Sequence, residues 1–312
     1  MSATGVGLDP ATYVPHPVHR DQRSYPETNC YTDIVVELLH ARGYEPLAAL
    51  GFLVRMDFEG DQWTFFKPPP GDLEALFGVD IHEMQPYRAL PDQIAEQLGA
   101  GRTVIVELDS WFLPDTAATD YRRAHVKTSV VAEAIDREAE TLRYFHNAGL
   151  HELRGEDYRG AFAAAGLPPY TEIARFDARP RLDGGALRAE ALRLLRDHLA
   201  RRPATNPFDR FGERLAADLP GLLDGDAAGY HAYAFATVRM AGAAFELLGS
   251  HARWLLGDAG EPAAAACERI VEGCKVLSFR LARRRAFDPQ PALAGLAAAW
   301  EDAMAALDAA VA

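Results

Sequence analysis

The spacing of apolar residues changes near residue 165, and this change constrains the fold more than any other feature of the sequence. Before it, short runs rich in β-branched and aromatic residues are interrupted by Pro and Gly, as at 102–109 and 126–135, which predicts strands. From Gly184 onward, apolar residues recur every three or four positions over long runs, which predicts amphipathic helices. We therefore predict an α+β domain over 1–167 and a mainly α-helical domain over 168–312.

Composition and charge narrow the functions that are open to this chain. Its 312 residues are 49% hydrophobic and 25% charged, as in folded globular proteins. The 45 acidic and 32 basic side chains give a net charge of -13, which repels a phosphate backbone and argues against a nucleic-acid partner. No stretch approaches the roughly 18 to 20 apolar residues of a membrane span, and residues 1–10 lack a signal-peptide pattern. We expect a cytoplasmic protein that does not bind membranes.

The three cysteines are predicted to be free thiols, because a secreted disulfide scaffold would place more of them in less chain. Cys267 and Cys274 are seven residues apart on a predicted helix. They would share a face of that helix, but two turns, about 10 Å, separate them, which is too far for a disulfide. We predict that both are core residues of the helical half.

Cys30 stands immediately before a stretch in which apolar residues fall on one helical face and Gly43 supplies a stop. The sequence therefore predicts that Cys30 lies at a helix N-terminus. A helix N-terminus and a neighbouring imidazolium together lower the pKa of a thiol from about 8.5 toward roughly 3.5 to 7.5. Cys30 is thus a candidate nucleophile, and the alternative is a small buried residue without chemistry.

Two further residues are predicted to act with this thiol. The runs 102–109, 126–135 and 141–146 read as strands, with a turn at 136–138. His125 opens the second strand, and Asn147 ends the third. A carboxylate or amide oxygen at the end of an adjacent antiparallel strand can accept the second N–H of an imidazole. We predict His125 as the base and Asn147 as its orienting group. Alternatively, His125 is only a polar residue at a strand end, and Asn147 is only a turn former.

Four residues near this set are candidates for substrate binding. Asp109 ends a strand and could bind a substrate amine, or it could merely cap a turn. Trp111 could form an acyl-binding wall or belong to the core. Asn29 supplies an amide beside the thiol, and Tyr121 lies in the segment before His125.

Several other chemistries lack support in the sequence. His16 and His19 have a spacing that can ligate a metal ion, but no second pair completes a site, so no metal is predicted. The patterns typical of serine hydrolases, P-loop kinases and dinucleotide-binding dehydrogenases are absent.

Several long motifs of the first half resemble known families. The stretches NCYTDIVVELLHARGYEPLAAL, FEGDQWTFFKPPP, VELDSWFLPDT, YRRAHVKT and YFHNAG are similar to the bacterial proteins grouped as domain of unknown function 1839. More distantly, VELDSWFLPD, His125, VKTSVVAEAID and LRYFHN resemble the N-terminal domain of the butirosin biosynthesis protein H family, over about residues 28 to 150. The match departs from that family at Asn29, where His is frequent, and at Asn147, where Asp is expected.

The second resemblance implies a papain-like thiol enzyme that transfers an acyl or aminoacyl group in specialised metabolism. Cys30 would attack a thioester on the phosphopantetheine arm of an acyl or peptidyl carrier protein, and a small-molecule amine would accept the group. The enzyme would need no cofactor of its own.

Two alternatives to this transferase remain open, and so does the role of the helical half. One alternative is a papain-like thiol hydrolase or amidase, and the other is a non-catalytic module that binds a carrier protein. The helical half could shape the acceptor pocket, dock a carrier through Arg280 and Arg283 to Arg285, or build a homodimer.

Overall fold

The computed structural model describes residues 2–20, 22–163 and 168–312, and it confirms a mixed α+β protein with an antiparallel sheet. The chain divides into two compact units. The first, here called the sheet unit, comprises Met1–Arg20, Asn29–Pro46 and Pro69–Leu182. The second, the helical unit, comprises Asp21–Thr28, Leu47–Pro68 and Asp183–Ala312. Two short segments of the first half of the chain therefore belong to the helical unit, in addition to the helices that follow residue 182.

The sheet has the strand order β2-β7-β3-β4-β5-β6, and β1 pairs with β4. The strands are β1 (Ser2–Thr4), β2 (Asp80–Glu83), β3 (Thr103–Asp109), β4 (Lys127–Asp136), β5 (Thr141–His146), β6 (Gly149–Arg154) and β7 (Thr171–Arg175). The three strands predicted around His125 are confirmed as β3, β4 and β5. The register places Asp109 opposite Lys127 and Asp136 opposite Thr141. The turn between β4 and β5 is stabilised by Asp136, whose side chain accepts the N–H groups of Glu138 and Ala139.

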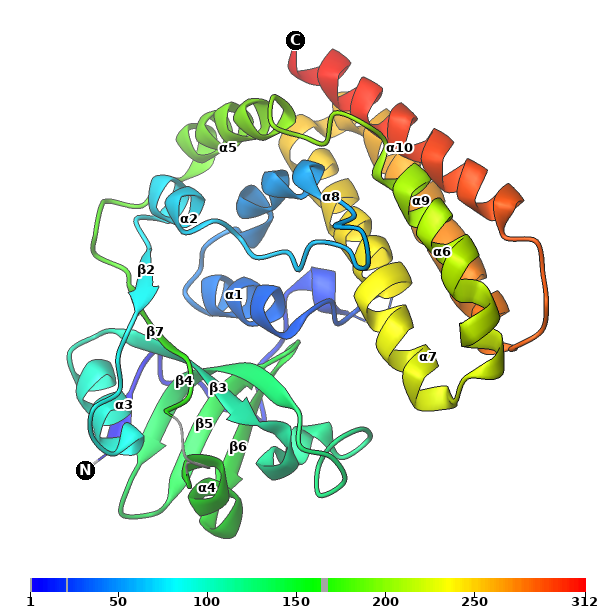
Figure 1. Ribbon diagram of the computed structural model, residues 1–312. Helices are drawn as coiled ribbons and strands as arrows, with labels where there is room; N and C mark the ends of the chain where they lie inside the picture. The colour runs from blue at the N-terminus through cyan, green and yellow to red at the C-terminus, as the bar shows by residue number, and fades with distance from the viewer. Residues whose placement is uncertain (1, 21, 164–167) are drawn as a thin grey trace. The chain divides into compact units, whose positions relative to one another are not determined.

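The two faces of the sheet pack against different helices, because successive side chains of a strand point to opposite faces. One face contributes Val104 and Val106 of β3 and Tyr144 of β5 to a core with α3 (Leu90–Gly99) and α4 (Gly155–Phe162). The helix α1 (Cys30–Ala41) packs on β4 and β5 from the other side, as Figure 1 shows. The sheet unit also contains α2 (Pro70–Phe77). Its short 3-10 helices cover Pro17–His19, Ser110–Phe112 and Pro114–Thr116.

From Gly184 onward the chain is mainly helical, whereas β7, which lies inside the range predicted as the helical domain, belongs to the sheet unit. The helices of the helical unit are α5 (Gly184–Leu199), α6 (Pro207–Asp224), α7 (Ala227–Ala234), α8 (Met240–Leu256), α9 (Glu261–Ala282) and α10 (Gln290–Val311). Shorter helical turns cover Pro46–Arg55, Phe235–Arg239 and Gly257–Gly260. Small residues bring the long helices together: a Cβ on Gly249 of α8 would lie 3.3 Å from the Cβ of Cys267 in α9. Cys267 and Cys274 are free and fully buried, as predicted, and burial raises the pKa of each thiol to about 12.

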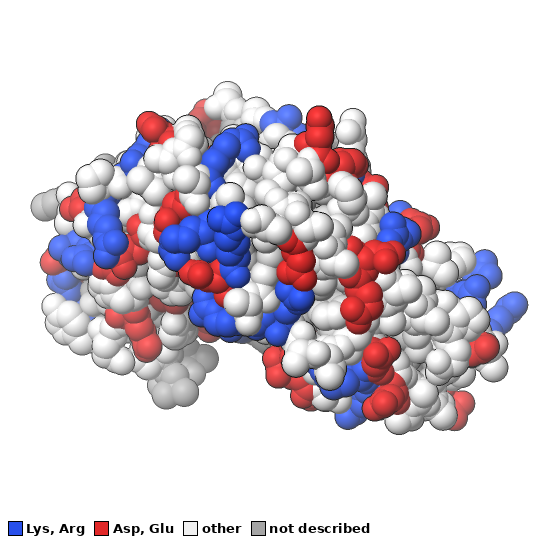
Figure 2. Space-filling view, turned by 90° about the horizontal axis from the view of Figure 1, so that it is seen from above, with Lys and Arg blue, Asp and Glu red and all other residues white. Residues whose placement is uncertain are grey.

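Charged side chains of both signs cover the surface. Basic and acidic groups are interspersed over the face shown in Figure 2. Many arginines are paired with carboxylates, as Arg202 is with Asp308 and Arg253 with Glu261. None of the helices in the described ranges combines the length and the apolar composition that crossing a bilayer requires.

Candidate functional site

Cys30 is the first residue of α1 and is partly exposed. The side chain of Asn29 caps the helix by accepting the N–H of Thr32 at 2.9 Å. The helix ends at Ala41, and Gly43 follows with a φ of +73°, as the sequence predicted. The thiol therefore lies at the positive end of the helix dipole. Asn29, a candidate for substrate binding, serves in this geometry as the helix cap.

Two hydrogen bonds fix the direction of α1 over the sheet. At its C-terminal end, Arg42 donates to Thr103 Oγ1, at the beginning of β3, at 2.8 Å. At its N-terminal end, the Tyr31 hydroxyl donates to Glu172 at 2.7 Å, and Glu172 pairs with Ile105 further along β3. The helix thus runs antiparallel to β3. The N-terminus of α1, where Cys30 lies, is therefore directed toward the end of β3 that carries Asp109.

His125 lies two residues before β4 and forms a pair with Asp109, the last residue of β3. Its Nδ1 is 2.6 Å from Asp109 Oδ2, and its ring stacks on Trp111 with centroids 4.5 Å apart and an interplanar angle of 8°. Asp109 Oδ1 accepts the N–H of Trp111 at 3.0 Å, so the carboxylate is held from two sides. The His125 side chain is 67% exposed. This arrangement fixes the ring through Nδ1 and leaves Nε2 available for proton transfer.

Asn147 lies in the turn between β5 and β6, with a φ of +47° that Asn tolerates better than most residues. Within the described residues, no hydrogen bond joins His125 to Asn147 or to the Cys30 thiol. The partner of His125 is Asp109, whereas the sequence predicted Asn147 in that role and Asp109 as a substrate ligand. The reason is that β4 pairs with β3 as well as with β5: the prediction took the orienting group from β5, but the side chain that reaches His125 comes from β3.

A cavity of about 820 Å³ opens beside the His125–Asp109 pair, within the size range of small-molecule sites. Its lining is mainly apolar, from the segment before α3, from β3 and from the end of α4; it includes Leu90, Leu108, Phe112, Phe162 and Pro169. Tyr87 is exposed at this cavity. Cys30 and Tyr121 are not among the lining residues. The Tyr121 hydroxyl instead donates to Asp157 of α4 at 2.9 Å, which ties the loop before His125 to that helix.

Gly160 of α4 allows the Phe112 ring to form one wall of this cavity, because a Cβ at that position would lie 2.1 Å from the ring. Gly160→Ala should displace the ring and destabilise the protein by about 1 to 3 kcal/mol, even though Ala favours helices over Gly by about 1 kcal/mol. Urea unfolding measures the change. Gly185→Ala is the matched control, since nothing lies within 4 Å of its Cβ in α5. Equal stabilisation of both variants would contradict the expected clash.

A second imidazole site, which the sequence reasoning missed, lies inside the sheet unit. His146 Nδ1 is 2.5 Å from Asp115 Oδ2, and its Nε2 is 2.8 Å from Thr128 Oγ1; Tyr144 also donates to Asp115. The order hydroxyl, imidazole, carboxylate matches that of serine hydrolases. The side chains of His146 and Asp115 are only 3% and 8% exposed, however. We therefore assign this network a structural role: it holds the loop that contains Asp115 against β4 and β5.

The pKa of Asp115 reflects that network. Burial would raise it, but the hydrogen bonds from His146 and Tyr144 hold it below its usual value. Spacing alone could not reveal this site, because its members come from a 3-10 helix and two strands.

His19, one of the two histidines with metal-ligand spacing, is buried between two carboxylates of α1. Its Nδ1 is 2.5 Å from Glu37 Oε1, and its Nε2 is 3.2 Å from Asp33 Oδ1. The backbone N–H of His16 also donates to Glu37, at 3.0 Å. Burial alone would lower the pKa of His19, but the two carboxylates raise it to about 9. This cluster holds the 3-10 helix Pro17–His19 against the helix that begins with Cys30.

These features define an α+β protein with a thiol at a helix N-terminus and an imidazole–carboxylate pair in the same unit. The sequence matches two family models, the DUF1839 N-terminal domain over residues 14–176 and the DUF1839 C-terminal domain over residues 184–309. The chain therefore belongs to the DUF1839 family, which confirms the first resemblance seen in its motifs. No curated protein matches the sequence.

Proposed function

We propose that this protein is a thiol-dependent acyltransferase, with a papain-like sheet unit, that moves an acyl or aminoacyl group from a carrier-protein thioester to an amine. The observation that carries the proposal is the His125–Asp109 pair at the end of β3 toward which the N-terminus of α1 points. A positioned base with its own orienting carboxylate, near a thiol at a helix N-terminus, is the arrangement that activates a cysteine nucleophile. The distant resemblance to the butirosin biosynthesis protein H family supports the same chemistry.

The proposed reaction has two steps. His125 Nε2 takes the proton of Cys30, and the thiolate attacks the thioester carbonyl; the bond to the pantetheine sulfur breaks, and that sulfur takes the proton back from His125. The amine then attacks the acyl-enzyme, loses a proton to His125, and releases the Cys30 thiol as the amide forms. Asp109 keeps the imidazole in the tautomer with its proton on Nδ1. The thiol and Nε2 must approach to hydrogen-bond distance in the substrate complex, as catalytic groups commonly do only on binding.

The cavity beside His125 is the proposed site for the acyl group. Its mainly apolar lining favours an aliphatic or aromatic substituent, and His125 and Asp109 in its wall place the reacting carbonyl at the proton-transfer group. In this scheme Asp109 orients the base, and Trp111 supports the imidazole ring from one face.

A basic groove in the helical unit supports the carrier protein as partner. Arg280, Arg283 and Arg285, here called the basic cluster, form no ion pair with a carboxylate in the described ranges. Arg280 and Arg283 line a mainly apolar groove of about 730 Å³ at the C-terminal half of α9, where Phe279 is exposed, and Arg285 follows two residues later in the chain. In a chain with a net charge of -13, such a surface is complementary to an acidic protein that presents an apolar side chain.

Reversing the charge of the three arginines of the basic cluster tests whether a carrier protein binds at this surface. Arg280→Glu, Arg283→Glu and Arg285→Glu together should raise the KM for a carrier-bound thioester by about tenfold or more, and the effect should shrink in high salt. The KM for the same acyl group on free pantetheine should change little. Steady-state kinetics with both donors measures the difference, and an equal change for both would argue against carrier docking at this surface.

Alkylation by limiting iodoacetamide at about pH 6, with the modified peptides mapped by mass spectrometry, tests the proposed thiolate, because an ordinary thiol of pKa near 8.5 is almost wholly protonated there. Cys30 should label first, and the His125→Ala variant should lose this advantage. Cys267 and Cys274 are internal controls, since both are buried and have raised pKa values. Labelling of Cys30 no faster than that of the two controls would favour the non-catalytic binding module.

Release of the free carboxylic acid in the absence of an amine distinguishes the proposed transferase from a thiol hydrolase or amidase. A thiol hydrolase or amidase would release the acid at the same rate with or without amine. A transferase should retain the acyl group on Cys30 until the amine is added, and intact-protein mass spectrometry detects the difference.

A further inference from the structure

The cavity in the sheet unit offers little to a charged group, because the charged side chains in its wall already have partners. Glu107 Oε1 accepts from Lys127 Nζ at 2.8 Å. Asp109 holds His125, and Arg88 is paired with a carboxylate of α3. Among the described lining residues, each carboxylate thus has a nitrogen partner already. A charged substituent that entered this space would lose its hydration without gaining a counter-ion of its own.

Phe112 forms one wall of the cavity, and its ring is held from two directions. A Cβ on Gly160 of α4 would lie 2.1 Å from the ring, so the ring lies directly against the backbone of that helix. The Arg122 guanidinium lies over the ring, 5.4 Å from its centroid, and donates to Asp157 of the same helix at 2.6 Å. Phe112 is therefore clamped between α4 and a guanidinium that is itself bound to α4.

The other apolar walls belong to the packed interior of the sheet unit. Leu90 and Leu108 are buried members of the core between the sheet, α3 and α4. Phe162 packs against Tyr158, with ring centroids 5.0 Å apart. Because packed side chains yield only at a cost in free energy, a ligand that is too long for the space of about 820 Å³ cannot enlarge it freely.

We infer that the donor group of the proposed reaction is an uncharged acyl chain, aliphatic or aromatic, and that Phe112 sets the longest chain that the cavity admits. The inference rests on the proposed function and narrows it, because it excludes aminoacyl groups whose ammonium would lie in the cavity. Each buried methylene should strengthen binding about fourfold until the chain meets the Phe112 ring. Beyond that length a further carbon must displace packed side chains, so binding should weaken.

Isothermal titration of the full chain with simple carboxamides tests the inference without requiring acyl transfer. Butanamide, hexanamide, octanamide and decanamide form a series of uncharged chains, and 6-aminohexanamide adds an ammonium group to the second of them. The affinity should rise along the series by about fourfold per methylene and then fall beyond a limiting length. 6-Aminohexanamide should bind about tenfold more weakly than hexanamide, or worse.

Substitutions of Phe112 test its role as the limiting wall. Phe112→Ala should increase the limiting length by about two carbons or more, because it removes the ring that the chain meets. Phe112→Leu keeps an apolar side chain and should shift the limit by less in the same direction, and it decides the question if the alanine variant does not fold. Phe65→Ala is the matched control, because Phe65 is an exposed phenylalanine of the helical unit that does not line the cavity.

The inference is overturned if 6-aminohexanamide binds as tightly as hexanamide, or if the folded Phe112 variants keep the wild-type limiting length. It is also overturned if neither hexanamide nor octanamide binds up to about 5 mM. None of these outcomes depends on Cys30, whereas the iodoacetamide experiment reports on that residue alone. Slow labelling of Cys30 together with the expected amide series would therefore reject the transferase and leave a module that binds acyl chains.

Discussion

Asp109→Asn is expected to slow acylation of Cys30 by about 10² to 10⁴, the loss seen when the carboxylate that orients a catalytic imidazole becomes an amide. The substitution keeps the size of the side chain, and its remaining oxygen can still accept the N–H of Trp111. Its amide group, however, would present N–H to His125 Nδ1 and favour the tautomer whose Nε2 already carries a proton. That tautomer cannot accept the proton of the thiol.

Asn147→Gly is the matched comparison, because the sequence predicted Asn147 as the group that orients His125. Glycine adopts the φ of +47° at this position without strain, so the change removes the amide and leaves the turn intact. Its acylation rate should stay within about threefold of the wild type. Single-turnover acylation by a thioester, followed by intact mass, measures both variants. A large loss in Asn147→Gly with little loss in Asp109→Asn would return the orienting role to Asn147.

Local sequence patterns predicted the elements that carry the candidate site. The start of α1 follows from the apolar face of residues 31–41, the Gly43 stop and the capping Asn29, all of which lie within a short stretch of chain. The strands β3, β4 and β5 follow from β-branched runs with polar interruptions. Patterns of this kind act over a few residues, so they can be read without knowledge of the fold.

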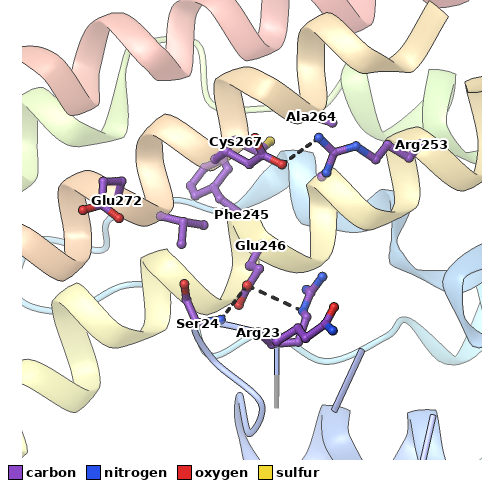
Figure 3. A pocket seen from close by; sticks show the side chains of 12 residues that line it. Arg23, Ser24, Phe245, Glu246, Arg253, Ala264, Cys267 and Glu272 are labelled. Atoms are coloured by element: carbon purple, nitrogen blue, oxygen red, sulfur yellow. Dashed lines mark hydrogen bonds and ion pairs between the residues drawn. The ribbon is translucent and has the colours of Figure 1, made fainter. Parts of the chain in front are cut away.

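The partners of each side chain could not be predicted in the same way, because they depend on which strands become neighbours. His125 precedes β4, which pairs with both β3 and β5. Only the three-dimensional structure shows that its partner is Asp109 of β3. The ion pair between Arg23 and Glu246 (Figure 3) likewise involves a segment, 21–28, that belongs to the helical unit although it precedes α1. No local sequence pattern indicates that residues 21–28 belong to the helical unit and not to the sheet unit.

The pH dependence of stability provides the second large effect, and it arises from His19. The pKa of this imidazole is raised to about 9 in the folded protein, from about 6.5 when unfolded, because the pull of Asp33 and Glu37 exceeds the opposing effect of burial. A raised folded-state pKa stabilises the protein fully below the unfolded value. The free energy of unfolding should therefore fall as pH rises from about 6.5 through 9, by up to about 3 kcal/mol.

Glu37→Gln separates this cluster from other sources of pH dependence. The amide keeps the shape of the side chain but removes the charge that Tyr13, His16 and His19 surround. Breaking a buried pair in this way should destabilise the protein by about 3 to 5 kcal/mol near pH 6 and flatten the decline between pH 6.5 and 9. Urea unfolding at a series of pH values measures both effects.

His82→Gln is the control for that series, because His82 is an exposed histidine of the same unit that pairs loosely with Asp80 at 3.5 Å. It should leave the pH slope unchanged. A wild-type protein whose stability is constant from pH 6.5 to 9 would mean that His19 is neutral in the folded state. Asp33 and Glu37 would then contact an uncharged ring. Because both carboxylates belong to α1, the protonation state of this cluster also sets how firmly the helix that presents Cys30 is held.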